Sequence, residues 1–244
     1  MIEFEHISIT LGGRKILSDV SLTIDEGDIF CIVGRSGVGK SVMIKQLVGL
    51  LTPDEGAIRF NGVDVLGLDE VGLQAMRKEC GMVFQHATLF DSMSCIENVM
   101  LPIRKHYKMK HHKAREKALM YMAEVGIEHL ADKDPATLGP GLRKLVAIAR
   151  TLTLEPRAIL FDEPTTGLDP LAARKFDQLV TGSLAGSNMT QVVVSHDVRS
   201  IFDIANKIAM LHEGRLRFLG TPHELENSED AVVRNFILGH PGEE

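Results

Sequence analysis

A glycine-rich segment between an apolar run and an amphipathic segment constrains the fold of this chain more than any other feature. Residues 34–41 read GRSGVGKS and match the phosphate-binding pattern GxxxxGK[ST]. They follow the apolar run 29–33, typical of a strand buried on both faces, and precede a segment with helical spacing of apolar residues. Glycines let several backbone N–H groups face one anion at the positive end of the next helix. We therefore expect a nucleotide-phosphate site here, since a chance glycine-rich turn has no need of this strand-to-helix setting.

The side chains of this segment have distinct expected roles. Lys40 is expected to reach the β- and γ-phosphates of a nucleotide, and the Ser41 hydroxyl is expected to ligate Mg²⁺. The expected phosphate-binding residues are consecutive in the chain: Gly34, Arg35, Ser36, Gly37, Val38, Gly39, Lys40, Ser41 and Val42.

Two carboxylates follow a second apolar run at 158–161. In a parallel sheet the carboxyl ends of the strands line the ligand crevice, so Asp162 and Glu163 are expected to face the phosphate-binding segment. We assign Asp162 to the Mg²⁺ shell, through water, and Glu163 to the general base that polarises an attacking water. Without the phosphate-binding pattern, this pair would indicate only solvated turn residues.

Two further polar residues follow apolar runs. His196 ends the run 192–195, where it is placed to contact a γ-phosphate, and Gln85 follows residues 82–84, where its amide is placed to touch Mg²⁺ and the attacking water. A lone histidine is more often structural or solvated, and a lone glutamine carries no information. Both residues become candidates for the site only because they occur together with the phosphate-binding segment and the two carboxylates.

Apolar runs of strand length alternate with segments of helical periodicity along the chain. Strands are expected at 2–9, 17–24, 29–33, 57–65, 82–84, 158–161, 191–195 and 210–217. Helices are expected at 41–51, 96–126, 142–154, 171–184 and 230–238. Buried strands that alternate with helices predict an α/β fold with a mainly parallel sheet, here with a helical insertion in the middle.

Composition excludes several classes of protein. The net charge of −6 argues against a nucleic-acid partner, because phosphate contacts need a surplus of Lys and Arg. The three cysteines form no paired spacing, which fits a reducing cytosol. No apolar run approaches the ~18 residues that span a bilayer, and the first residues have no signal-peptide pattern. If the chain serves transport, we expect another chain to supply the membrane path.

The ordered set of motifs resembles the ABC ATPase family along essentially the whole chain. The matching positions in chain order are residues 34–41, Gln85, the signature segment 138–142, Asp162 with Glu163, the D-loop 167–169 and His196. The resemblance implies a P-loop NTPase core with a mainly parallel sheet, an N-terminal antiparallel β subdomain and an inserted α-helical subdomain. It implies one domain over 1–244, with the core at 1–84 and 156–244 and the helical part at about 85–155. It also implies ATP and Mg²⁺ as cofactors.

The family resemblance implies a working homodimer. Each ATP would lie between the phosphate loop of one chain and the signature segment of the other, with Gly139, Gly141 and Asp169 among the nucleotide contacts. The region after Gln85 would contact an integral membrane permease subunit. The chain is then expected in the cytoplasm, peripheral on the inner face of the cytoplasmic membrane.

A narrower resemblance connects the chain to the Mla-type phospholipid transporter ATPases. It is carried by the stretches 34–42, 81–93, 194–197 and 233–239. It implies phospholipid transport between inner and outer membranes and a lipid-binding MCE-domain protein as a further partner. Two alternatives stay open: the ATPase of a polar-solute importer of the amino-acid type, and an ATP-binding regulator with weak hydrolysis.

Two segments depart from the family pattern. The signature usually reads Leu-Ser-Gly-Gly-Gln, but here it is LGPGL, so Gly139 replaces the serine that would bind the partner's γ-phosphate and Pro140 lacks an N–H. We favour a tolerated variant, with Gly141 keeping its backbone donor, over an ATPase that depends on its membrane partner to close. The adenine platform is aliphatic, with Ile9 and Leu11 as candidates, which leaves base selectivity open.

Overall fold

The computed structural model describes residues 1–239, apart from the side chains of Ser183 and Ser187. The strands in this range are β1 (Ile2–Leu11), β2 (Arg14–Ile24), β3 (Ile29–Val33), β4 (Glu55–Phe60), β5 (Val63–Asp64), β6 (Cys80–Val83), β7 (Ala158–Asp162), β8 (Thr190–Ser195), β9 (Lys207–His212) and β10 (Arg215–Gly220). The α-helices are α1 (Lys40–Leu47), α2 (Glu70–Glu79), α3 (Cys95–His106), α4 (His111–Glu124), α5 (Pro140–Leu152), α6 (Pro170–Leu179), α7 (Val198–Ile204), α8 (Pro222–Glu226) and α9 (Ala231–Ile237).

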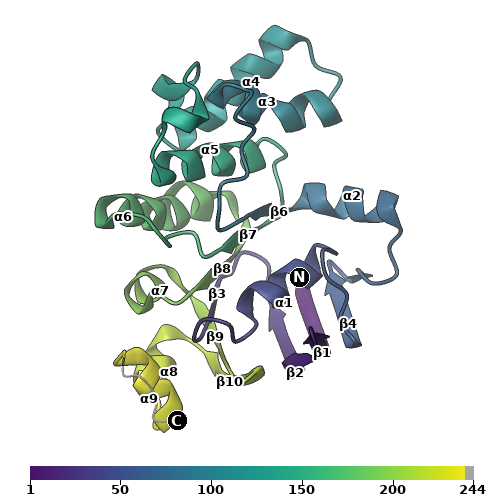
Figure 1. The fold of residues 1–244 in the computed structure, drawn as a ribbon, viewed down its shortest axis with the longest axis vertical. Coiled ribbons are helices and arrows are strands. Elements are labelled where there is room, and N and C mark those ends of the chain that lie inside the picture. The colour runs from purple at the N-terminus through teal and green to yellow at the C-terminus, as the bar shows by residue number, and fades with distance from the viewer. Residues whose placement is uncertain (240–244) are drawn as a thin grey trace.

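The strands form two sheets (Figure 1). The N-terminal sheet has the order β2-β1-β4-β5, and its neighbours are antiparallel. The larger sheet has the order β10-β9-β3-β8-β7-β6, in which only β10 runs against its neighbour. The predicted mainly parallel sheet and N-terminal antiparallel part are both confirmed.

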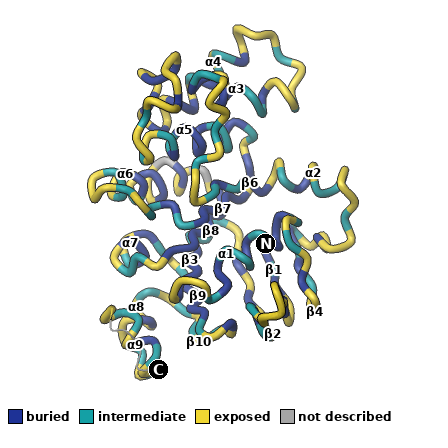
Figure 2. The backbone as a smooth tube through the Cα atoms, in the orientation of Figure 1, coloured by how far each residue is buried: buried dark blue, intermediate teal, exposed yellow. Residues whose placement is uncertain are grey.

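The inner strands β3, β8 and β7 of the large sheet are buried on both faces (Figure 2). Along β3, Phe30 and Ile32 belong to a core shared with the N-terminal sheet, α1 and α2, whereas Cys31 and Val33 belong to a core shared with the helices from α3 to α9. Because side chains alternate between the faces of a strand, a continuous apolar run is what two cores require. This double burial fixes the carboxyl end of β3, from which the phosphate-binding segment begins.

Three helices between β6 and β7 pack on one another. Helix α3 contacts both α4 and α5, and α4 contacts α5. A capping box between Ser94 and Glu97 begins α3. We propose that residues 85–155 form a helical subdomain within a single domain over 1–244, of which residues 240–244 lie outside the described range. No helix of residues 1–239 has the length and apolar character needed to cross a membrane.

Several segments differ from the expected boundaries because turns interrupt the pattern. The segment 57–65 is a hairpin whose turn residues Asn61 and Gly62 have φ of 52° and 77°. The segment 210–217 likewise crosses a turn at Glu213 and Gly214, with φ of 49° and 73°. The helical region 96–126 is divided between α3 and α4. Helices α2, α7 and α8 were not expected from periodicity.

Candidate active site

The phosphate-binding segment adopts a conformation that only glycine permits at two positions. Gly34 has φ of 144°, and a Cβ there would collide with the backbone oxygen of Leu211 on β9. Gly39 has φ of 111°, and a Cβ there would lie 2.5 Å from Leu17 Cδ2 on β2. These positions need glycine both for the left-handed backbone and for the close approach of neighbouring strands. Arg35, Ser36 and Gly37 are exposed, whereas Val38 and Val42 are half-buried.

Lys40 lies inside the loop that precedes it. Its side chain is 4% exposed, and Nζ donates to the Gly34 oxygen at 2.8 Å and to the Arg35 oxygen at 3.1 Å. Burial lowers the pKa of the Lys40 amine, and the neighbouring carboxylates Glu163 and Asp162 act in the opposite direction. A cation surrounded by backbone groups at a helix N-terminus fits the phosphates of a nucleotide.

Ser41 and Asp162 meet at the base of the loop. The Ser41 hydroxyl donates to Asp162 Oδ1 at 2.5 Å, and Lys45 Nζ lies 3.8 Å from Asp162 Oδ2. One hydroxyl and one carboxylate suit Mg²⁺, which takes its remaining ligands from water and substrate phosphates. Within residues 1–239, no group of three or more His, Cys, Asp or Glu side chains is placed to hold a metal by itself. The oxygen donors therefore fit Mg²⁺ bound together with a nucleotide.

Glu163 occupies the centre of the site. Its Oε1 lies 3.6 Å from Lys40 Nζ, and its Oε2 lies 2.6 Å from His196 Nδ1. Thr166 Oγ1 also donates to Oε2, at 2.7 Å. The backbone of Glu163 has φ of 50°, although its N–H continues the sheet by donating to the Val194 oxygen. A non-glycine residue in this region of φ is strained, and such strain concentrates at functional sites.

The structure brings together only some of the expected site residues. Lys40, Ser41, Asp162, Glu163 and His196 are linked by the contacts above. Gln85 follows the end of β6, beside β7, and its side chain is exposed. Leu11 ends β1 opposite Arg14, is 37% exposed, and lies on the hairpin whose Leu17 approaches Gly39.

The signature segment begins helix α5. Gly139 is the N-cap residue, with φ of −65° and ψ of 162°, and Pro140 is the first helical residue. Both are exposed, and a Cβ at Gly139 would meet open space. Gly141 packs near Ala172, where a Cβ would be 3.2 Å from the alanine methyl. Asp169 caps α6 through the N–H groups of Leu171 and Ala172.

Three residues of this region escape prediction from the sequence. Lys45, Lys144 and Thr166 carry polar groups that touch the site, but each stands among residues that an amphipathic helix or a turn commonly contains. Thr166 has the clearest signal, since a hydroxyl three residues after an acid is able to bond back to it. Lys144 has none, because lysine on a helix usually indicates solvent.

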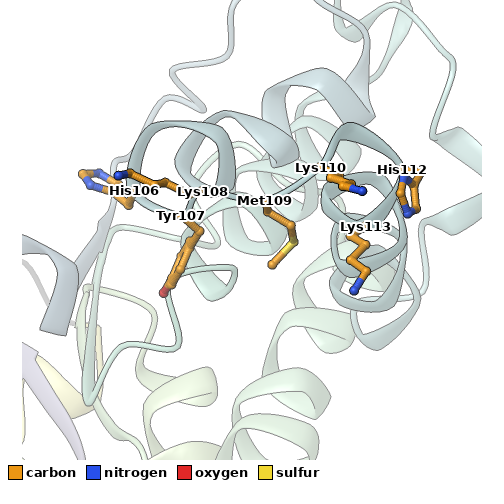
Figure 3. Close-up of a pocket in the computed structure, with 7 residues that line it drawn as sticks. All are labelled: His106, Tyr107, Lys108, Met109, Lys110, His112 and Lys113. Atoms are coloured by element: carbon orange, nitrogen blue, oxygen red, sulfur yellow. The ribbon is translucent and has the colours of Figure 1, made fainter.

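A separate hollow of about 630 Å³ lies on the connection between α3 and α4 (Figure 3). Its lining contains three lysines and two histidines: His106, Tyr107, Lys108, Met109, Lys110, His112 and Lys113. Figure 1 places this connection away from β3 and α1, so the hollow is not part of the phosphate site.

The family model described as ABC transporter matches residues 17–166, most of the segment that builds the site. The chain belongs to the ABC transporter family. This assignment makes the protein an ATPase and confirms the predicted ABC ATPase resemblance. The loop before α1 and the acidic end of β7 both lie within the matched residues.

Curated relatives align with nearly the whole length of this chain. The intermembrane phospholipid transport system ATP-binding protein MlaF of Haemophilus influenzae is 34% identical over 98% of this chain and 90% of the relative. The probable ribonucleotide transport ATP-binding protein mkl of Mycobacterium tuberculosis is also 34% identical, over 98% of this chain and 66% of the relative. The predicted similarity to Mla-type ATPases is thus confirmed.

A solved structure agrees with the ABC fold. The ATP-binding cassette MJ0796, a dimer in a post-hydrolysis state bound to ADP and Pi, superimposes with a TM-score of 0.84 at 30% identity. The match covers 91% of this chain and 99% of that one.

Proposed function

We propose that this ABC ATPase powers phospholipid transport between two membranes, as a homodimer bound to an integral membrane permease and associated with an MCE-domain lipid-binding protein. We place it at the cytoplasmic face of the inner membrane. The observation that carries the enzymatic part is the Glu163 carboxylate, held between Lys40 and His196 at the phosphate-binding loop. The transport part rests on the MlaF relative.

The contacts give each residue a task in ATP hydrolysis. Lys40 and the N–H groups before α1 bind the phosphates, and Ser41 and Asp162 hold Mg²⁺, which neutralises phosphate charge when bound. Glu163 accepts a hydrogen bond from the attacking water and polarises it. His196, only 2.6 Å from Glu163, orients that carboxylate and is placed to contact the γ-phosphate. Gln85, exposed at the end of β6, completes the Mg²⁺ and water contacts.

A dimer would complete the nucleotide site. Gly139 and Pro140 are exposed at the N-terminus of α5, with open space before them. A helix N-terminus directed at solvent is suited to anionic groups supplied by a second molecule. The dimeric state of MJ0796 supports a dimer here. In that dimer we propose that Gly139, Gly141 and Asp169 face the partner's ATP and that Leu11 packs on the adenine.

Replacing the proposed base tests the chemistry. We expect Glu163→Gln to lower Mg²⁺-dependent ATP turnover by at least ~100-fold, since general-base catalysis contributes ~10²–10⁴-fold. ATP binding should persist, because the phosphate contacts are made by other residues. Turnover is measured as phosphate release, and binding with a fluorescent ATP analogue. Unchanged turnover would remove Glu163 from this role.

Capture from native membranes tests the transport assignment. A tagged Glu163→Gln chain, loaded with ATP and extracted in mild detergent, should co-purify with a multi-span permease, an MCE-domain protein and phospholipid. A periplasmic solute-binding protein in their place would indicate a polar-solute importer. The mkl name makes ribonucleotide a necessary competitor, so ATPase stimulation by phospholipid and by a ribonucleotide other than ATP should be compared in the same complex purified with the wild-type chain. Stimulation by ribonucleotide alone would contradict the lipid proposal.

A further inference from the structure

Lys144 is a buried cation on the signature helix that the expected catalytic set does not include. Its side chain is 4% exposed, and Nζ donates to the Pro164 oxygen at 2.6 Å and to the Glu163 oxygen at 3.3 Å. Burial lowers the pKa of its amine, while Glu163 and Asp162 raise it. A buried ammonium is strongly unfavourable unless its donors are satisfied, so these two carbonyls are what permit Lys144 to stay here.

The turn that accepts these bonds carries the proposed base. Glu163 has φ of 50°, which a residue with a Cβ leaves readily unless its surroundings hold it. Its N–H is fixed by the Val194 oxygen on β8, and its carbonyl accepts from both Lys144 Nζ and the Thr166 N–H. The direction of the Glu163 side chain therefore depends on the contact at its N–H and on the contacts at its carbonyl oxygen.

The helix that carries Lys144 is also attached to the segment that follows Gln85. Arg143 Nη2 lies 3.0 Å from Asp91 Oδ1, and Arg150 donates to the Thr88 oxygen at 2.8 Å. Both contacts come from α5, whose exposed first residues form the signature segment. One rigid helix thus connects the signature segment, residues 88–91 and the Glu163 turn.

We propose that Lys144 is a positioning residue that fixes the Glu163 turn to α5, so that hydrolysis depends on where the signature helix lies. This inference rests on the proposed role of Glu163. A partner molecule that binds at the N-terminus of α5 or at residues 88–91 would shift this helix. The Lys144 ammonium group would then displace the Glu163 and Pro164 carbonyls to which it is bonded. Lys144 does not itself touch the nucleotide.

Two neutral replacements and one conservative one test this role. Lys144→Met keeps the length and apolar stem of the side chain without its ammonium. Lys144→Gln is neutral and too short to reach both carbonyls, and serves if the methionine variant does not fold. Lys144→Arg keeps the charge. Lys117→Met is the matched control, because Lys117 is half-buried, packs near Tyr107 and forms an ion pair with Glu155 in the same helical region.

Hydrolysis is measured on the full chain under single-turnover conditions, with protein in excess over labelled Mg²⁺-ATP. This detects hydrolysis even when its rate is low. We expect Lys144→Met and Lys144→Gln to hydrolyse at least ~10-fold more slowly, since small displacements of a catalytic group cost up to ~100-fold. ATP affinity should stay within about twofold, because the phosphate contacts are untouched. Lys144→Arg should restore most of the rate. Lys117→Met should lower Tm and leave the rate of hydrolysis unchanged.

Hydrogen exchange provides a readout that is independent of turnover. Amides of residues 163–168 should exchange faster in the neutral Lys144 variants, and not in Lys117→Met. Wild-type hydrolysis and wild-type exchange in the neutral variants would overturn the inference. So would a loss of rate that arginine does not restore. Glu163→Gln is run in parallel: if it abolishes hydrolysis while the Lys144 variants do not, only the Lys144 inference fails. If Glu163→Gln is fully active, the proposed function of the carboxylate fails instead.

Discussion

Two helix N-termini serve the proposed ATP site, and their glycines are present for different reasons. Before α1, Gly34 and Gly39 have φ of 144° and 111°, and any Cβ would strike a neighbouring strand. Before α5, Gly139 has φ of −65° and faces open space. The first loop is thus specified by its own backbone, whereas at the second any residue fits. A departure from the family motif therefore lowers the stability of the fold at the phosphate loop, whereas at Gly139 in the signature it changes the stability little.

A matched pair of alanine variants tests this difference most directly. Gly34→Ala should destabilise the chain by roughly 3 kcal/mol or more, since the added methyl is forced against the Leu211 backbone oxygen. Gly139→Ala should change stability by less than about 0.5 kcal/mol, as surface changes without special backbone geometry do. Urea unfolding of both variants measures this. Equal losses would show that the two loops are alike.

Removing a side chain from the first N-terminus should have the next largest effect. Lys40→Ala is expected to weaken ATP binding by roughly 100-fold, because hydrogen bonds to charged groups contribute ~1.5–3 kcal/mol each. Titration with a fluorescent ATP analogue measures the Kd, and Lys113→Ala on α4 controls for loss of a surface charge. Undiminished binding by Lys40→Ala would contradict the assignment of this loop to phosphate.

The same contrast explains which parts of the fold sequence patterns predict. The strand at Ile29–Val33 is constrained by two cores, and the loop after it is constrained by the backbone geometry of its glycines. Their sequence pattern is therefore sufficient to predict the strand and the loop. The hairpin turns at Asn61-Gly62 and Glu213-Gly214 divide segments that share one apolar pattern, and the pattern alone does not locate them. Helix α2 has only one buried residue, Met76, and its Val71 is exposed, so its apolar side chains do not all face a core.

The candidate site divides in the same way. Asp162 and Glu163 are predictable because a strand end delivers them to a sheet edge together with the phosphate loop. Lys144 and Thr166 act on Glu163 through contacts across 19 and 3 residues of sequence, and their direction depends on tertiary packing. No local pattern distinguishes a lysine that reaches a buried carbonyl from one that reaches water.

Restoring the family signature should have the smallest effect on activity. The geometry accepts it, because Gly139 is an extended N-cap with no side-chain cap and no atom within 4 Å of a Cβ. In the double variant Gly139→Ser, Pro140→Gly, the hydroxyl gains one hydrogen bond to a charged phosphate. ATP turnover should rise by about tenfold, the lower end of the ~1.5–3 kcal/mol that such a bond contributes, because Gly139 is exposed.

Serine is also a favourable N-cap, but its gain over glycine is only about a few tenths of a kcal/mol. Because Pro140→Gly also removes a proline preorganised for the first helical position, the double variant should gain no net stability. Rates must still be compared per folded molecule, beside Gly139→Ala, which adds a Cβ without a hydroxyl. A small increase would make the LGPGL signature a tolerated substitution at a permissive position. An increase of 100-fold or more over nearly inactive wild-type protein would contradict this view. The open space before α5 would then be a defect in the partner's ATP site that the membrane subunits must correct.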